Sequence, residues 1–229
     1  MRNLIFILCW ILIGGQGYSQ SVQKVKGNKK FGLRAAVNYS GLTGSKNYTS
    51  YPTGIIYSIG PYNQSPFQIK GFSAGVFAEI TFSDEITVSP ELDYSLKGNN
   101  YNINGVLNGK PYDIALNVNL NYITVPFFIK YHPAVLQGIN LFAGPELGWL
   151  ISASQVVTGD LDAGKTSLNS QFTKMDAGLC FGLDYYFGKN FGLDIRYFMG
   201  FANVAPPEEN TYVHNRTFQA GVKYRFGDY

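Results

Sequence analysis

Cysteine, charge and long apolar segments are all scarce in this 229-residue chain. Its two cysteines are Cys9 and Cys180. Because Cys9 lies in a segment that we expect to be removed, no intramolecular disulfide can form. No later segment reaches the about 20 apolar residues that a membrane-spanning helix needs, so any membrane span would have to be made of strands. Charged residues make up 14% of the chain, against about 25% typically, so something other than water must cover part of the surface.

The N-terminal segment has the features of a secretory signal peptide. Arg2 precedes an apolar run, Leu4–Ile13, that is too short to span a bilayer. The small residues after this run are typical of a signal-peptidase site and predict cleavage before Gln20. We expect three parts: a signal peptide (1–19), a periplasmic leader (20–30) and an outer-membrane β-barrel domain (31–229). Loss of Arg2 lowers the number of Lys and Arg from 18 to 17, against 15 Asp and Glu. The resulting net charge of +2 does not suggest nucleic acid as a partner.

An alternation of apolar and polar residues runs through the rest of the chain and predicts strands, with no segment that reads as a helix. In ITVSPELDYSLK (86–97), Ile86 and Leu92 share one face while Glu91 and Asp93 share the other. The eight predicted strands are Phe31–Ser40, Gly71–Phe82, Ile86–Lys97, Leu116–Tyr131, Ile139–Ser152, Met175–Phe187, Phe191–Phe201 and Thr217–Phe226.

One of these strands, Leu116–Tyr131, changes the parity of its apolar positions. Apolar residues occupy even positions from Leu116 to Leu120 and odd positions from Ile123 onward, so the change falls near Asn121–Tyr122. This change predicts a bulge or two distinct segments.

The connections between the predicted strands alternate in length. Three are brief turns: Ser83–Glu85, His132–Gly138 and Gly188–Asn190. Four are long polar loops: residues 41–70, 98–115, 153–174 and 202–216. Short turns at one end, long loops at the other and an even strand count are typical of bacterial outer-membrane barrels.

Three features favour lipid outside the barrel over the alternative of a soluble lipocalin-like barrel with an apolar core. The polar faces are rich in glycine, which leaves room for long side chains inside a narrow barrel. The apolar faces have aromatic residues at their ends, such as Phe31 and Tyr39 around Leu33, as expected at the two membrane boundaries. The final predicted strand alternates aromatic and aliphatic residues close to the C-terminus, which resembles the signal that the barrel-assembly machinery reads.

The predicted interior then contains acids and bases in near balance. Its charged residues are Arg34, Glu79, Glu91, Asp93, Lys97, Glu146, Asp176, Asp184, Asp194, Arg196, Lys223 and Arg225. Buried charges are tolerable only when they are paired and hydrogen-bonded. We therefore predict a structural charge network that fills the lumen as a polar packed interior and leaves no open pore.

The segment GDLDAGKT (159–166) matches the phosphate-binding loop pattern letter for letter. A functional loop of this kind follows a buried strand and opens a helix, whereas this match lies in a long loop that leads into another strand. Asp160 and Asp162 would also repel a polyphosphate. We interpret the match as accidental and expect no nucleotide or other cofactor.

His132 and His214 lie in different connections at opposite ends of the barrel, so they cannot share a metal or a proton relay. His214 is the only candidate for a general base, and a lipid-modifying enzyme centred on it is the alternative function. Cys180 alternates with Leu179 and is expected to be a packed, inert thiol inside the barrel. We predict no catalytic, cofactor-binding or metal-binding residue.

Four segments resemble the outer-membrane β-barrel family of Bacteroidetes that includes the PorT-like proteins. They are LNYITVPFFIKY (120–131), LFAGPELGWL (141–150), MDAGLCFGLDYYF (175–187) and FGLDIRYFMGFANV (191–204). Thr124 stands where the family usually has an acidic residue before the proline. The resemblance implies an integral outer-membrane barrel, and some family members are similar to components of protein secretion and gliding systems.

The sequence as a whole predicts an eight-stranded antiparallel up-and-down transmembrane barrel in the outer membrane, monomeric and without enzymatic activity. Its expected partners are outer-membrane lipid, the barrel-assembly machinery during biogenesis, and a protein bound through the loops or the periplasmic face. The Tyr-rich segment 47–66 is the most distinctive loop feature, and stacking on a sugar or protein is one interpretation of it.

Overall fold

The computed structural model describes residues 29–44, 69–107, 110–136, 138–159, 164–170, 172–204 and 212–226. The predicted signal peptide, most of the predicted leader and the Tyr-rich segment 47–66 lie outside these ranges. Nine strands make up the regular structure of the described ranges, which confirms the all-β class. No helix in this part of the chain is long and apolar enough to cross a membrane.

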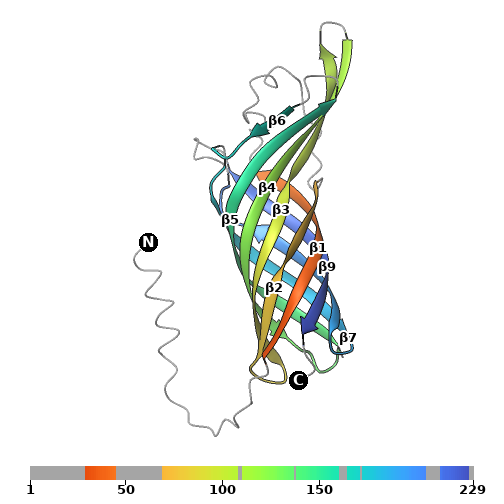
Figure 1. Ribbon diagram of the computed structural model, residues 1–229, viewed down its shortest axis with the longest axis vertical. Helices are drawn as coiled ribbons and strands as arrows, with labels where there is room; N and C mark the ends of the chain where they lie inside the picture. Colours follow the sequence, from red (N-terminus) through yellow and green to blue (C-terminus); the bar gives the residue numbers. More distant parts are fainter. Residues whose placement is uncertain are drawn as a thin grey trace, which may run out of the picture.

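Eight of the nine strands form a closed antiparallel ring. The strands are β1 (Lys29–Gly44), β2 (Ile69–Thr81), β3 (Ile86–Leu107), β4 (Lys110–Tyr131), β5 (Ile139–Gly159), β6 (Gly164–Ser167), β7 (Met175–Phe187), β8 (Phe191–Gly200) and β9 (Val213–Phe226). Each strand of the ring pairs with its neighbours in the order β1-β2-β3-β4-β5-β7-β8-β9, and β9 pairs with β1 to close it (Figure 1). The predicted eight-stranded up-and-down barrel is therefore confirmed. The short strand β6 pairs with β5 alone and adds nothing to the ring.

The two ends of the barrel differ. At one end, here called the turn end, residues 82–85, 132–138 and 188–190 connect β2 to β3, β4 to β5 and β7 to β8. At the opposite end, here called the loop end, β3, β4 and β5 extend well beyond the ring (Figure 1). These are the longest strands, with 22, 22 and 21 residues.

The prediction of a polar loop over residues 98–115 is wrong. The β3–β4 ladder continues without a break from Leu96 opposite Asn121 to Leu107 opposite Lys110, so these residues form a long hairpin arm. Cross-strand pairing satisfies the backbone groups of this Asn- and Gly-rich segment, which its side chains alone do not mark as a strand. The predicted loops 153–174 and 202–216 are also too long, because β5 continues to Gly159 and β9 begins at Val213. Likewise, β1 begins at Lys29, inside the predicted leader.

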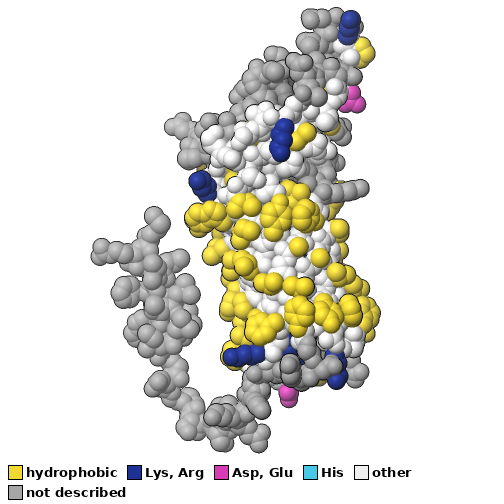
Figure 2. Space-filling model, viewed as in Figure 1, with side chains coloured by type: hydrophobic (Ala, Val, Ile, Leu, Met, Phe, Trp, Pro, Cys, Tyr) yellow, Lys and Arg dark blue, Asp and Glu magenta, His cyan; other side chains and the backbone are white. Residues whose placement is uncertain are grey.

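The outward face of the ring is apolar, as predicted. Phe31 is 60% exposed, Val76 50% and Leu92 50%, whereas the adjacent Glu91 is 4% exposed. Figure 2 shows hydrophobic side chains covering the barrel wall, with Lys and Arg side chains beyond both ends of this band. A surface of this kind is stable against lipid hydrocarbon and unstable in water. The orientation with apolar residues outside and charged residues inside is confirmed.

A register shift lies where the change of parity predicted it, but on the other strand. Asn121 pairs with Ser152 and Tyr122 pairs with Leu150, so Ile151 is the extra residue of the bulge and belongs to β5. From Ile114 to Lys130, β4 keeps its even positions buried, so Leu116 and Leu120 lie on the inward side of the strand and not on the lipid side. The parity of the apolar residues in β4 changes because the lumen side chains change from polar to apolar toward the loop end. The inward and outward faces of the strand do not exchange.

Candidate functional site

The middle of the lumen holds a network of buried ion pairs. Arg34 on β1 places Nε 3.0 Å from Oδ1 of Asp194, and Nη2 of the same arginine lies 3.0 Å from Asp194 Oδ2. Arg196 on β8 bonds the same Asp194 through Nε at 2.9 Å and Glu91 through Nη1 at 2.8 Å. Lys223 on β9 adds a contact of 3.0 Å to Glu91 Oε1. These two carboxylates therefore each meet two cations.

A second cluster lies nearer the loop end. The Nζ of Lys97 lies 2.9 Å from Oε1 of Glu146 and 3.6 Å from Oδ2 of Asp176. Asn215 donates to Asp176 Oδ2 at 2.8 Å, and the Lys97 ammonium lies 3.6 Å from the ring centroid of Phe198. The lysine is thus held by two carboxylates and an aromatic face at the same time.

A third cluster lies near the turn end and centres on a residue that the sequence analysis missed. The Nζ of Lys130 lies 2.6 Å from Glu79 Oε1 and 2.6 Å from Asp184 Oδ2. Glu79 also forms an ion pair with Arg225, in which Nε of the arginine lies 2.7 Å from Oε2 of the glutamate. The inward parity of Phe128 on the same strand was the available signal for Lys130, because residues two apart on a strand share a face.

All twelve predicted interior residues lie within these clusters or beside them. Eleven of them are buried, and the side chain of Arg225, at the turn end, is 12% exposed. Asp93 is the least tightly bound, with Oδ2 3.8 Å from Arg34 Nη1. Removing one partner of such a buried pair costs about 3–5 kcal/mol, because the other charge is left uncompensated. The ion pairs therefore hold the lumen side chains in place.

Apolar side chains fill the lumen toward the loop end. The cluster consists of Leu42, Val118, Leu120, Tyr122, Leu150, Ala153, Leu168, Phe172, Val204 and Val213. A smaller cluster of Phe128, Phe142, Cys180 and Phe198 packs beside the ion pairs. Between the charges and the loop end, the barrel is therefore closed by packed apolar groups.

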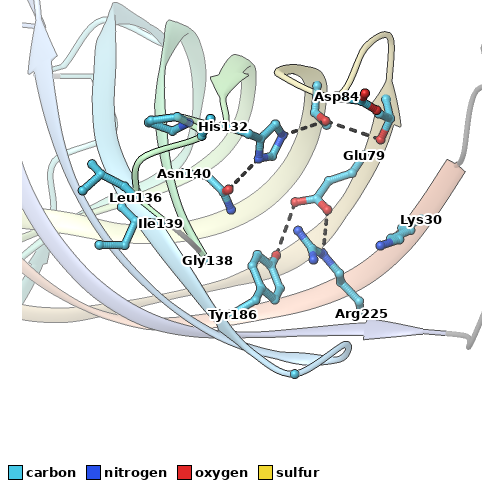
Figure 3. Close-up of a pocket in the computed structure, with 15 residues that line it drawn as sticks. Lys30, Glu79, Asp84, His132, Leu136, Gly138, Ile139, Asn140, Tyr186 and Arg225 are labelled. Carbon is cyan, nitrogen blue, oxygen red and sulfur yellow. Dashed lines mark hydrogen bonds and ion pairs between the residues drawn. The ribbon is translucent and has the colours of Figure 1, made fainter.

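The turn end is open to solvent. A vestibule of about 770 Å³ lies there, bordered on one side by Lys30 and Arg225 and on the other by Leu136 and Ile139 (Figure 3). The Arg225 guanidinium carbon lies 3.2 Å from the ring centroid of Tyr186. The volume falls in the range of about 300–1,000 Å³ that is typical of ligand sites, and barrel mouths are one of their usual places.

The two histidines are held by hydrogen bonds at opposite ends of the barrel. His132 lines the vestibule, with Nε2 2.9 Å from Thr87 Oγ1 and Nδ1 beside Asn140 Oδ1. His214 lies in β9 rather than in the predicted loop, and its Nδ1 is 3.0 Å from the carbonyl oxygen of Ala202. Within the described ranges, no group of three His, Cys, Asp or Glu residues is arranged to hold a metal ion.

The phosphate-loop match also has a defined place. Gly164–Ser167 forms the exposed strand β6, where a nucleotide-binding loop would begin a helix. Residues 160–163 lie outside the described residues. The strand supports the interpretation that the match is accidental.

Residues 18–205 match the family model described as outer membrane protein beta-barrel domain. The chain belongs to this family. The protein is thus an integral β-barrel of the outer membrane, and its apolar outer wall is the surface that faces lipid. No curated protein matches the chain in sequence.

Several solved outer-membrane proteins are similar to it. Neisserial surface protein A is 16% identical over 87% of this chain and 99% of that chain, with a TM-score of 0.46. Ail, the attachment invasion locus protein of Yersinia pestis, is 13% identical over 87% and 99%, with a TM-score of 0.46. A major outer membrane protein from Thermus thermophilus is 13% identical over 87% and 100%, with a TM-score of 0.42.

Proposed function

We propose that this outer-membrane barrel is a closed, non-enzymatic interaction protein that binds its partner through the turn end, which faces the periplasm. The observation that carries the proposal is the contrast between the two ends of the lumen. Ion pairs and apolar groups fill the barrel toward the loop end, whereas the vestibule opens at the turn end. A closed barrel with one open mouth is suited to binding and unsuited to conduction.

The same geometry gives little support to catalysis. His132 has both ring nitrogens within hydrogen-bonding distance of neighbouring side chains. The Nδ1 of His214 is bonded to a backbone carbonyl, and no Ser or Asp side chain is bonded to this histidine in the described part of the chain. A lipid-modifying activity centred on His214 is therefore not the function that we propose.

The finer assignments belong to the same proposal. The four segments that resemble the PorT-like barrels of Bacteroidetes form parts of β4, β5, β7 and β8, with residues 201–204 beyond the last of these. We propose membership of this subgroup, and a role for the periplasmic face in a protein secretion assembly follows from that resemblance. Cleavage of residues 1–19 and a monomeric barrel complete the proposal.

Two measurements test it. Purified protein in planar lipid bilayers is expected to give no discrete conductance steps, and stable open steps would contradict a closed barrel.

The orientation is tested with single cysteines at Val135, in the turn between β4 and β5, and at Lys165, in β6. Val135 is 88% exposed and Lys165 is also exposed. A membrane-impermeant maleimide is expected to label Lys165→Cys on intact cells and Val135→Cys only after the outer membrane is permeabilised. The reverse pattern would place the vestibule outside.

A further inference from the structure

The vestibule wall carries a cation that lacks a carboxylate. Lys30 lies directly opposite Glu79 in the β1–β2 ladder, a position in which the two side chains would ordinarily form an ion pair. Glu79, however, has Oε1 bonded to Lys130 and Oε2 paired with Arg225. Among the described residues, no carboxylate lies within ion-pairing distance of Lys30.

The local charge count agrees with this geometry. Four cations, Lys30, Lys130, Lys223 and Arg225, lie around two buried acids, Glu79 and Asp184, although Lys223 lies closer to Glu91 than to Asp184. Asp184 is itself bonded to Lys130 and to Asn140. Lys30 and Arg225 place positive charge on the side of the vestibule formed by β1 and β9 (Figure 3), and the lining also includes the carboxylates of Glu79 and Asp84. Asp84, the remaining acid of the lining, is exposed in the turn between β2 and β3.

The facing side of the vestibule contains a group of apolar residues beside the polar side chains of His132 and Asn140 (Figure 3). The apolar residues are Pro133 and Leu136 in the turn between β4 and β5, and Ile139 at the start of β5. Val135 at the tip of that turn is 88% exposed. The turn between β7 and β8 has the polar sequence GKN at residues 188–190, and in the turn between β2 and β3 the polar residues SDE at 83–85 follow the exposed Phe82. An exposed apolar turn beside a cavity is a surface that gains free energy when a partner covers it.

We propose that the vestibule binds a carboxylate carried on an apolar group. Lys30 and the free edge of the Arg225 guanidinium bind the carboxylate, and Leu136 and Ile139 contact the apolar group. Charge-assisted hydrogen bonds to a carboxylate are stronger than neutral ones, and Tyr186 and Glu79 already hold the arginine in place. The ligand is either a free organic acid or the C-terminus of a peptide. This assignment rests on the proposed role of the turn end as the binding face.

The test uses the full protein in lipid nanodiscs and two carboxylate probes: hexanoate, and the tripeptide N-acetyl-Gly-Leu-Phe with a free C-terminus. The same tripeptide with an amidated C-terminus is the probe control. Saturable binding is measured by calorimetry and by the methyl chemical shifts of Leu136 and Ile139.

Lys30→Gln is expected to weaken binding about tenfold, the effect of losing one charge-assisted contact. Lys189→Gln removes the same charge from a turn of the same end, outside the cavity, and is expected to leave binding unchanged.

Binding of both carboxylate probes would show that a free acid suffices, and binding of the tripeptide alone would assign the site to a peptide terminus. The proposal is overturned if neither probe saturates, if the amidated tripeptide binds equally well, or if Lys189→Gln weakens binding as much as Lys30→Gln. Asp84→Asn provides a further check, since tighter binding by more than about tenfold would place the carboxylate beside Asp84, in the turn between β2 and β3, and not at Lys30 and Arg225. These binding results are independent of the conductance and labelling tests. The proposed binding face and the proposed ligand can therefore be contradicted separately.

Discussion

The Nζ of Lys130 lies 2.6 Å from Oε1 of Glu79, although 51 positions separate the two residues in the chain. Both side chains are buried, and Asp184 supplies the second carboxylate of the lysine. The contact joins β4 to β2 across the lumen, between strands that do not pair with each other. Interior ion pairs therefore tie the barrel wall together through its centre, in addition to the backbone ladders.

Replacement of Lys130 by Met is expected to destabilise the barrel strongly. The change leaves Asp184 without its closest cation and removes one of the two cations of Glu79, so the free energy of unfolding should fall by about 3–5 kcal/mol. Urea unfolding in micelles, followed by tryptophan fluorescence and gel mobility, measures the difference. Lys189→Met, at an exposed turn position, is the control and should change stability by less than about 0.5 kcal/mol. Equal effects would mean that the buried pair is not a stabilising contact.

A cation on the outer wall is expected to hinder insertion into the membrane. Val76 lies in the middle of the outward face of β2, between Phe72 and Phe82, and is 50% exposed. Val76→Arg should cost about 2–4 kcal/mol in a bilayer, because the guanidinium would lie in hydrocarbon. Thr158→Arg, on the exposed end of β5, should cost close to nothing. Equilibrium folding into lipid vesicles compares the two, and similar values would argue against lipid at Val76.

Gly75 is expected to tolerate no side chain. A Cβ atom at this position would overlap the carboxylate of Asp93 and the backbone carbonyl of Leu92, whereas a Cβ at Gly164 in β6 meets nothing within 4 Å. Gly75→Ala should therefore destabilise the barrel by about 1–3 kcal/mol, the usual cost of overpacking. Gly164→Ala serves as the matched control in thermal unfolding, where only the first variant should melt earlier. A normal melting temperature for Gly75→Ala would show that the neighbouring strand moves away at little cost.

Cys180 is expected to be unreactive in the folded barrel. Its side chain is fully buried beside Phe128, Phe142 and Phe198, and a thiol must be accessible to react. N-ethylmaleimide should modify the peptide containing Cys180 only after denaturation, as measured by mass spectrometry. Val135→Cys provides an exposed thiol on the same barrel and should react at once. Rapid modification of Cys180 in the native protein would indicate that the lumen opens frequently.

The alternation of side chains was sufficient to predict most of the wall. An even position such as Leu92 faces outward and its neighbour Glu91 faces inward because successive residues of a strand point to opposite sides. The charged residues could be assigned to the lumen for the same reason, since lipid excludes them from the outer wall. Their partners could not be predicted, because the distance between Lys97 and Glu146 depends on the tilt and stagger of strands that the chain order does not specify.

The loop end shows where a local pattern is insufficient. Residues 98–107 are rich in Asn and Gly, which are depleted in strands, yet they pair with β4 along their whole length. The ladder that begins in the membrane-spanning part continues outward and pairs backbone groups that would otherwise need water. The change of parity in β4 could not show by itself that Leu120 lies inside the barrel, because a buried plug and a lipid-facing wall both contain apolar side chains.

By itself, the sequence determined the all-β class, the eight strands of the ring and, for most of their length, the side of each strand that meets lipid. These properties follow from residues close together in the chain, through a period of two and the exclusion of charge from hydrocarbon. Only the tertiary structure decided which charges meet, where the bulge at Ile151 lies and that the lumen ends in a vestibule at Lys30 and Arg225. Those features depend on contacts between residues distant in sequence, which ring closure brings within a few ångströms of one another.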